Sequence, residues 1–170
     1  MTSARSSEPK GPKLPTRFAV VTISDTRTKD DDEAGAALCE QLVKRGHEIA
    51  QYSIVAENPT SIRTAVQTLV HGNKVDIVIT IGSTGITDRD CAPESIGPLI
   101  EKHLVGFGEL FRFLSFKDVG PAAGFTRAFA GRIGRSVVFC LPGASRAVDL
   151  AVDSLILPEV DHLLAMVRGR

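Results

Sequence analysis

The sequence predicts an α/β domain built on a mainly parallel sheet. Short β-branched and apolar runs alternate along the chain with stretches in which apolar residues recur at helical spacing. The run at 75–81 is almost continuously apolar, as in strands that helices cover on both faces. With 170 residues, 43% of them hydrophobic, the chain is long enough for one domain with a sizeable core.

The folded domain is predicted to span residues 17–170. Residues 1–16 are rich in Ser, Pro and Lys and contain few apolar side chains. A segment of this composition cannot bury enough apolar surface to offset the entropy of ordering, so we expect a disordered tail. The remaining pattern shows no internal repeat and does not require a second domain.

The first half of the domain is predicted to contain three strands and two helices. The strands are expected at residues 18–23, 47–55 and 75–81. Four acidic residues at 30–33 favour the N-terminus of the first helix, and Gly46 is suited to the position that follows its last turn. Asn58 and Pro59 fit the N-cap and first position of the second helix, which Gly72 ends.

The second half is predicted to continue the alternation. Pro93 opens a helix that runs towards Lys102, although Gly97 and Pro98 make its pattern imperfect. The other helices are expected at 106–116, 147–155 and 158–167, and the strands at 129–133 and 137–141. A parallel sheet requires such helical crossovers between its strands.

Charge and cysteine content exclude several classes of protein. Lys and Arg total 20, as do Asp and Glu, so the net charge is zero and predicts neither a nucleic-acid nor a membrane partner. The three cysteines are an odd number without CxxC spacing, which argues against a disulfide framework or a structural zinc site. No apolar run resembles a signal peptide or a membrane span. We therefore expect a cytoplasmic protein.

The strongest candidate for a ligand site directly follows the third predicted strand. There the chain places Gly82, Ser83, Thr84 and Gly85, and Asp90 follows shortly before a helix start. Ligands of open α/β sheets bind outside the carboxyl ends of the strands, and exposed amides with hydroxyls suit a phosphorylated ligand. An ordinary turn with solvated charges is the alternative. The glycines match neither a P-loop nor a dinucleotide fingerprint.

Two acidic residues flank the start of the helix at Pro93. Asp90 fits either an N-cap or a residue that binds Mg²⁺ or orients a phosphate-transfer nucleophile. Glu94 lies in the first helical turn, where it fits a capping box or a contact with polar groups of a ligand. The residue types alone leave both pairs of alternatives open.

Three further segments supply candidate site residues. Pro142, Gly143 and Ser145 repeat the design of a strand that leads through glycine into a helix, and two such turns make a shared anion site more plausible. Ser24 and Asp25 also follow a strand and are expected to face the same crevice.

The segment Thr126-Arg127, followed by Gly131, is harder to interpret. Arg127 fits a phosphate contact, but a surface or subunit salt bridge is the commoner role of an arginine. Nearby, six of the eight phenylalanines fall between Phe107 and Phe129, more than one helix face of a small domain can bury. Core packing and a subunit contact are the favoured roles of these rings, ahead of stacking on a nucleobase or a pterin.

Taken together, these segments resemble the MoaB/MogA family of molybdenum cofactor biosynthesis proteins, and its MoaB branch more than its longer MogA branch. The resemblance covers residues 18 to about 168. Its motifs occur in order at residues 23–26, 82–85, 90–94, 106–112, 126–131 and 141–143. Each motif is weakly specific alone, whereas their ordered combination is highly specific.

The resemblance implies a three-layer α/β sandwich with helices on both faces of the sheet, assembled as a homotrimer or homohexamer. It also implies molybdopterin as ligand, and ATP with Mg²⁺ in those members that adenylylate the pterin's terminal phosphate. Asp90 would then be a catalytic and metal-binding residue, and other molybdenum cofactor enzymes would be partners. The residues expected to bind the ligand are Ser24, Asp25, Gly82, Ser83, Thr84, Gly85, Glu94, Thr126, Arg127, Gly131, Pro142, Gly143 and Ser145.

The chain departs from the family pattern at four positions. Ser83 replaces the second glycine of the usual Gly-Gly-Thr-Gly, which is unfavourable if that position has a positive φ. Ala92 replaces a threonine, and Thr126 replaces a serine, which is a mild change. Ala56 stands where active adenylyltransferases carry an Asp, with Glu57 as the adjacent carboxylate. Losing one of two metal-holding carboxylates should weaken phosphoryl transfer.

Two functions therefore remain open. One is a MoaB-type molybdopterin-binding protein that also adenylylates its ligand through Asp90 and Glu57. The other is a catalytically inactive oligomer that binds the pterin or serves as a scaffold in the same pathway.

Overall fold

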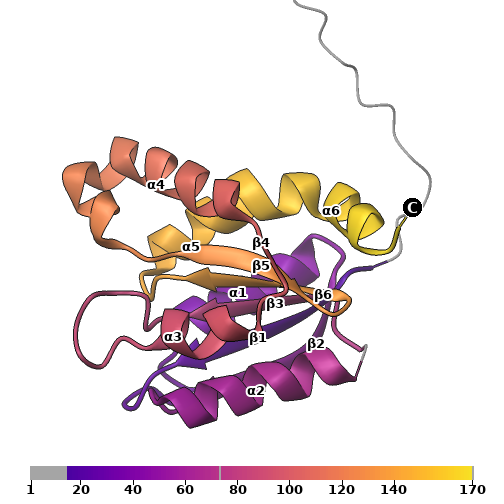
Figure 1. Ribbon diagram of the computed structural model, residues 1–170, viewed down its shortest axis with the longest axis horizontal. Coiled ribbons are helices and arrows are strands. Elements are labelled where there is room, and N and C mark those ends of the chain that lie inside the picture. The colour runs from indigo at the N-terminus through magenta and orange to yellow at the C-terminus, as the bar shows by residue number, and fades with distance from the viewer. Residues whose placement is uncertain (1–14, 73, 170) are drawn as a thin grey trace, which may run out of the picture.

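The protein is a three-layer α/β sandwich (Figure 1). The computed structural model describes residues 15–72 and 74–169. Six strands form one sheet in the order β2-β1-β3-β6-β5-β4. Their bounds are β1 Arg17–Ile23, β2 Glu48–Val55, β3 Ile77–Ile81, β4 Lys102–His103, β5 Phe129–Ile133 and β6 Ser136–Leu141. The predicted fold class is confirmed.

The sheet is mixed. Strands β2, β1, β3 and β6 run parallel to one another, whereas β5 and β4 pair antiparallel at one side. All residues of β3 and β6 are buried, because helices cover both faces of these central strands. The parallel strands bring their carboxyl ends to one edge of the sheet.

Four helices cover one face of the sheet and two cover the other (Figure 1). The first set contains α1 Glu33–Lys44, α4 Val105–Val119, α5 Ser145–Ala151 and α6 Val160–Val167. The second set contains α2 Pro59–His71 and α3 Ala92–Ile96. Alternate residues of the central strands point to opposite faces of the sheet. Val20 and Ile79 pack against the first set of helices, and Val21 and Val78 pack against the second set.

Asp32 connects the start of α1 to the two strands beneath it. Its buried carboxylate accepts hydrogen bonds from the Thr22 hydroxyl of β1, the Tyr52 hydroxyl of β2, Arg27 and the Gly35 amide. Burial raises the pKa of Asp32, but these hydrogen bonds outweigh it and hold the pKa below its usual range. The carboxylate therefore stays charged and caps α1 from inside the fold.

The predicted helix from Pro93 to Lys102 is wrong in its second half. Helix α3 ends at Ile96 and continues only as a 3₁₀ turn at Gly97–Leu99. Pro98 has no amide proton, and its ring would clash with the carbonyl of residue 94 in a continued α-helix. Lys102 instead begins β4 and pairs with Arg132 of β5.

The last predicted helices form one nearly continuous helical segment. A turn of π-helix at Val152–Ile156 and a 3₁₀ turn at Leu157–Glu159 connect α5 to α6. The predicted tail, residues 1–16, lies outside the described residues except for Pro15 and Thr16. Thr16 is buried, and its carbonyl accepts a hydrogen bond from the Glu48 amide. Within the described ranges, no helix is long and apolar enough to cross a membrane.

Asp76 joins the C-terminal helix to the start of the sheet. The carboxylate is buried and accepts hydrogen bonds from the Arg17 amide at 2.9 Å and from Arg168 Nη2 at 2.8 Å. Burial raises the pKa of Asp76, but the bonds from Arg17 and Arg168 outweigh it and lower the pKa below its ordinary value of 3.8.

We expect Asp76→Asn to destabilise the protein by about 2 kcal/mol at pH 7, since hydrogen bonds to a charged group are lost. The stabilisation by Asp76 is complete above the ordinary carboxyl pKa and disappears as the pH falls through the lowered pKa. The gap in unfolding free energy between wild type and variant should therefore narrow at acid pH. Urea unfolding at pH 7 and pH 3 measures it, and an equal gap at both would contradict this role.

Candidate functional site

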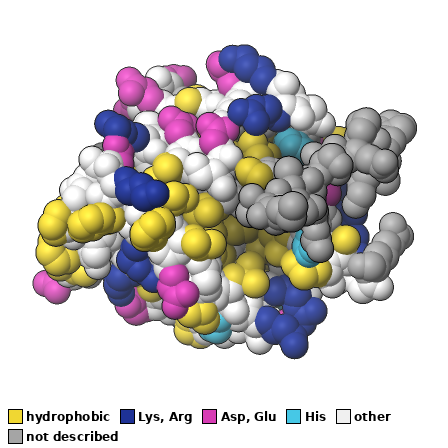
Figure 2. All heavy atoms as spheres, turned by 90° about the horizontal axis from the view of Figure 1, so that it is seen from above, with side chains coloured by type: hydrophobic (Ala, Val, Ile, Leu, Met, Phe, Trp, Pro, Cys, Tyr) yellow, Lys and Arg dark blue, Asp and Glu magenta, His cyan; other side chains and the backbone are white. Residues whose placement is uncertain are grey.

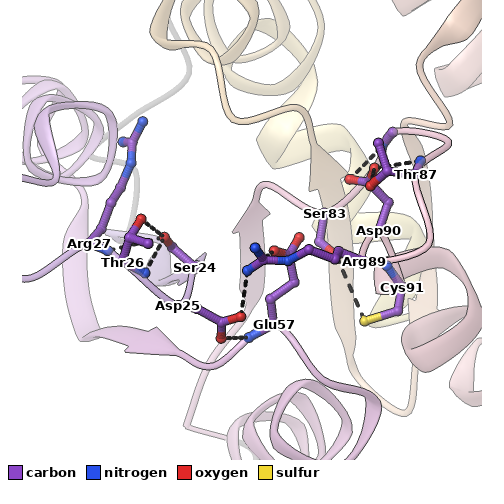
Figure 3. A network of polar contacts seen from close by, with 11 residues as sticks. Ser24, Asp25, Thr26, Arg27, Glu57, Ser83, Thr87, Arg89, Asp90 and Cys91 are labelled. Atoms are coloured by element: carbon purple, nitrogen blue, oxygen red, sulfur yellow. Dashed lines mark hydrogen bonds and ion pairs between the residues drawn. The ribbon is translucent and has the colours of Figure 1, made fainter.

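Four loops meet at the carboxyl edge of the parallel strands. The Ser24 amide donates to the Val55 carbonyl, and the Gly82 amide donates to the Leu141 carbonyl, each at 2.9 Å. Gly143 lies so close to Gly82 that a Cβ on Gly143 would contact the Gly82 Cα at 3.7 Å. The segments after β1, β2, β3 and β6 are therefore neighbours, and Figure 3 shows three of them from close by.

The loop between β3 and α3, residues 82–91 (the β3–α3 loop), leaves the sheet with two left-handed residues. Gly82 has a φ of 104°, and a side chain there would place its Cβ 2.8 Å from the Ile23 carbonyl oxygen. Ser83 has a φ of 58°, and among the described residues no other non-glycine has a positive φ. The unfavourable serine expected from the sequence is thus confirmed.

Ser83 compensates for this backbone strain through its side chain. Its Oγ accepts a hydrogen bond from the Cys91 amide at 2.8 Å, and its carbonyl accepts one from the Ala92 amide at 3.0 Å. A glycine at this position could make only the second bond. The serine therefore fastens the two ends of the β3–α3 loop together.

Asp90 organises the middle of the same loop. Its carboxylate accepts hydrogen bonds from the Gly85 amide at 3.1 Å, the Thr87 amide at 2.9 Å and the Thr87 hydroxyl at 2.6 Å. Burial raises the pKa of Asp90, but the bonds from Thr87 and Gly85 outweigh it and leave the pKa below its usual range. Asp90 does not cap α3, because the N-cap residue of that helix is Cys91 and no side chain caps it.

Arg127 holds the β3–α3 loop from the segment that precedes β5. Its amide donates to the Thr84 carbonyl at 2.9 Å, its Nε to the Gly85 carbonyl at 2.7 Å and its Nη2 to the Asp90 carbonyl at 3.0 Å. Its Nη1 pairs with Glu94, and this hydrogen bond lowers the pKa of the Glu94 carboxyl. Of the two roles considered for Arg127, the structure shows a salt bridge, made within the chain.

The remaining carboxylates at this edge of the sheet belong to Asp25 and Glu57. Asp25 Oδ1 accepts a hydrogen bond from the Glu57 amide at 2.8 Å, and Asp25 Oδ2 pairs with Arg89 Nη2 at 2.7 Å. The same nitrogen lies 3.5 Å from Glu57 Oε2. Figure 3 shows Arg89 pointing towards Asp25 and Glu57, whereas Asp90 turns towards Thr87. The two carboxylates are therefore bridged by a guanidinium.

Arg89 was missed by the sequence analysis. Its signal is a single basic residue between two acidic ones in the Asp88-Arg89-Asp90 stretch. Such charges usually remain solvated, so nothing in the sequence distinguishes this arginine from a surface residue.

The other candidates lie in the segments around these loops or within the sheet. Ser145 is the first residue of α5, and the Thr126 hydroxyl accepts a hydrogen bond from the Ala128 amide at 3.3 Å. Gly131 lies within β5, where a Cβ would come 2.3 Å from Ile100 Cγ2. Its contacts show a packing role between β4 and β5, apart from the loops that hold the other candidates. Pro142 and Gly143 lie in the turn after β6, beside Gly82.

The carboxylates at this edge of the sheet do not converge on a shared point. In the part of the chain that the structure describes, no group of three or more His, Cys, Asp or Glu residues is arranged to hold a metal ion. Asp90 directs its carboxylate to its own loop, and Asp25 and Glu57 share Arg89. These residues do not form a Mg²⁺ site from protein ligands alone.

The role of Ser83 can be tested with two variants. Ser83→Ala keeps the unfavourable φ and loses the bond to the Cys91 amide, whereas Ser83→Gly loses the bond but relieves the strain. We expect the alanine variant to be less stable than the glycine variant by about 1 kcal/mol. Thermal unfolding of both proteins measures the difference. An alanine variant as stable as the glycine variant would show that the positive φ of residue 83 does not destabilise a side chain there.

Comparison with known proteins identifies the family. A family model described as a probable molybdopterin binding domain matches residues 19–162. Molybdenum cofactor biosynthesis protein B of Bacillus cereus is 49% identical over 148 residues, which cover 86% of this chain and 88% of that protein.

Solved structures agree with this match. The crystal structure of a molybdenum cofactor biosynthesis protein B superposes with a TM-score of 0.90 at 45% identity, covering 95% of this chain and 100% of the other. That of the tungsten cofactor synthesizing protein MoaB from Pyrococcus furiosus gives a TM-score of 0.83 at 39% identity, with coverage of 92% and 99%. The chain therefore belongs to the MoaB/MogA family of molybdenum cofactor biosynthesis proteins, is of the MoaB type, and carries that family's molybdopterin-binding domain.

Proposed function

We propose that the protein binds molybdopterin at the carboxyl edge of its sheet, with the terminal phosphate against the β3–α3 loop. The observation that supports this most directly is the construction of that loop. Arg127 and Asp90 hold it from opposite sides through its carbonyls and amides, so that its shape is set before a ligand arrives. A preorganised loop at this edge loses little conformational entropy on binding.

The same geometry favours binding without adenylyl transfer. Phosphoryl transfer with Mg-ATP needs carboxylates that position the metal between the phosphates. Ala56 has no carboxylate, Glu57 shares Arg89 with Asp25, and Asp90 holds its own loop. We therefore propose a binding role in molybdenum cofactor synthesis and place adenylyl transfer through Asp90 and Glu57 as the alternative. A scaffold role, in which other molybdenum cofactor enzymes are the partners, is compatible with either.

One experiment separates the two functions. Purified protein is mixed with molybdopterin, ATP and Mg²⁺, and both pterin binding and a single turnover to adenylylated molybdopterin are measured. Saturable binding without product above the protein-free control supports the proposal. Product formation identifies an adenylyltransferase that tolerates Ala56, and absence of binding rejects both functions.

Restoring the missing carboxylate should change the outcome of that experiment. We expect Ala56→Asp to form adenylylated product at a rate at least about tenfold above the protein-free control, because a carboxylate at this position can share Mg²⁺ with the ligand's phosphates. Ala56→Asn has the same shape without the charge and is the matched control. Equal rates for wild type and both variants would show that the carboxylate at this position does not limit the reaction.

The exposed aromatic side chains of α4 support an oligomer. Phe113 and Phe116 are 60% and 57% exposed, and Phe125 is 67% exposed in the turn that follows. Figure 2 shows hydrophobic side chains gathered on the face that α4 and α6 form. Apolar patches of this kind mark protein interfaces, so we propose that they contribute to a homotrimer or homohexamer.

We expect replacement of both Phe113 and Phe116 by Ser to lower the mass measured by light scattering from that of an oligomer to that of a monomer. Each side chain would otherwise bury apolar surface against a second copy. Val43→Ser, which removes an apolar side chain of similar exposure from α1, is the control. A wild-type protein that is monomeric at all concentrations would rule out the assembly.

A further inference from the structure

Two arginines lie at the site, Arg89 within the β3–α3 loop and Arg127 beside it, and they differ in how many of their N–H donors form hydrogen bonds. Arg127 uses Nε, Nη1 and Nη2, on the Gly85 carbonyl, Glu94 and the Asp90 carbonyl. Every nitrogen of this guanidinium therefore has a protein partner. Three of its five N–H donors are thus in use, and the two that remain belong to nitrogens already directed at Glu94 and at the Asp90 carbonyl.

In Arg89, by contrast, only one nitrogen of the guanidinium has a partner in the described part of the protein. Its two contacts, with Asp25 and Glu57, both use Nη2. Within residues 15–72 and 74–169, Nε and Nη1 of Arg89 have no hydrogen-bond partner, and the side chain is 64% exposed. This guanidinium therefore presents unused charged donors to solvent.

The two carboxylates fix where Arg89 points. Asp25 and Glu57 follow the first and second strands, and Arg89 reaches them from the loop after the third (Figure 3). The Asp25 carboxylate also accepts a hydrogen bond from the Glu57 amide, which helps to fix its position beside Arg89. A guanidinium held in this way loses less rotamer freedom when a ligand binds.

We propose that Arg89 is the phosphate-binding arginine of this crevice and that Arg127 only positions the loop. This rests on the proposed function, since the phosphate is that of the bound pterin. Guanidinium groups suit phosphate because they donate several charged hydrogen bonds in one plane. Asp25 and Glu57 together exceed Arg89 by one negative charge, so the measurements include Mg²⁺ at a fixed concentration to screen that excess.

The test compares molybdopterin with its dephosphorylated form by anaerobic calorimetric titration. Wild type should prefer the phosphorylated pterin by about tenfold to a hundredfold, the range expected for hydrogen bonds to a charged group. Arg89→Met should abolish this preference and leave the affinity for the dephosphorylated pterin unchanged. Arg89→Lys, which keeps the charge but lacks Nε and Nη1, should restore part of it.

Two further variants assign the effect to Arg89 itself. Arg135→Met removes an exposed arginine from the turn between β5 and β6, at the opposite end of β6, and should behave as wild type. Arg127→Lys should weaken binding of both pterins together, because it disturbs the loop rather than the phosphate contact. An Arg89→Met protein that keeps the wild-type preference would overturn the proposal.

A titration with inorganic pyrophosphate separates failure of this proposal from failure of the proposed function. If wild type binds neither pterin, the proposed function is wrong. Arg89 is then judged by pyrophosphate alone: binding that Arg89→Met loses and Arg135→Met keeps supports an anion site at Arg89. Equal binding by all three proteins, or none by wild type, rejects it.

Discussion

The candidate site depends on the hydrogen bonds that the Arg127 guanidinium makes to two carbonyls of the β3–α3 loop. Those carbonyls belong to Gly85 and Asp90, the residues that the Asp90 carboxylate also brings together through the Gly85 amide. The loop is thus held by its carbonyls from one side and by its amides from the other. Because Arg127 lies two residues before β5, the antiparallel part of the sheet helps to determine the shape of a loop that leaves its parallel part.

Features that depend on local sequence pattern were predictable. The strands could be located because β-branched runs and glycine turns are signals within a few residues, and the strand ends then located most of the loops of the site. The strain at Ser83 could also be anticipated, since a position that favours glycine is a property of the backbone. The family resemblance rests on the same short segments.

Features that depend on distant partners were not predictable. The roles of Arg127 and Arg89 are decided by Glu94 and Asp25, which lie 33 and 64 residues away in the chain. The missing side chain of Gly131 makes room for Ile100, a contact that no spacing rule indicates. The short strand at Lys102 was hidden by helical pattern, because its pairing with β5 is set by tertiary structure.

The strand order has a consequence for how the protein is made. Strands β1, β2 and β3 leave the ribosome early, but the free edge of β3 is covered only by β6, whose Val137 pairs with Ile77 from 60 residues earlier. Arg127 also emerges after the loop that it holds. A nascent chain therefore carries an apolar, unpaired strand edge and an unfastened loop until most of the domain has been synthesised, an interval in which chaperones would protect it.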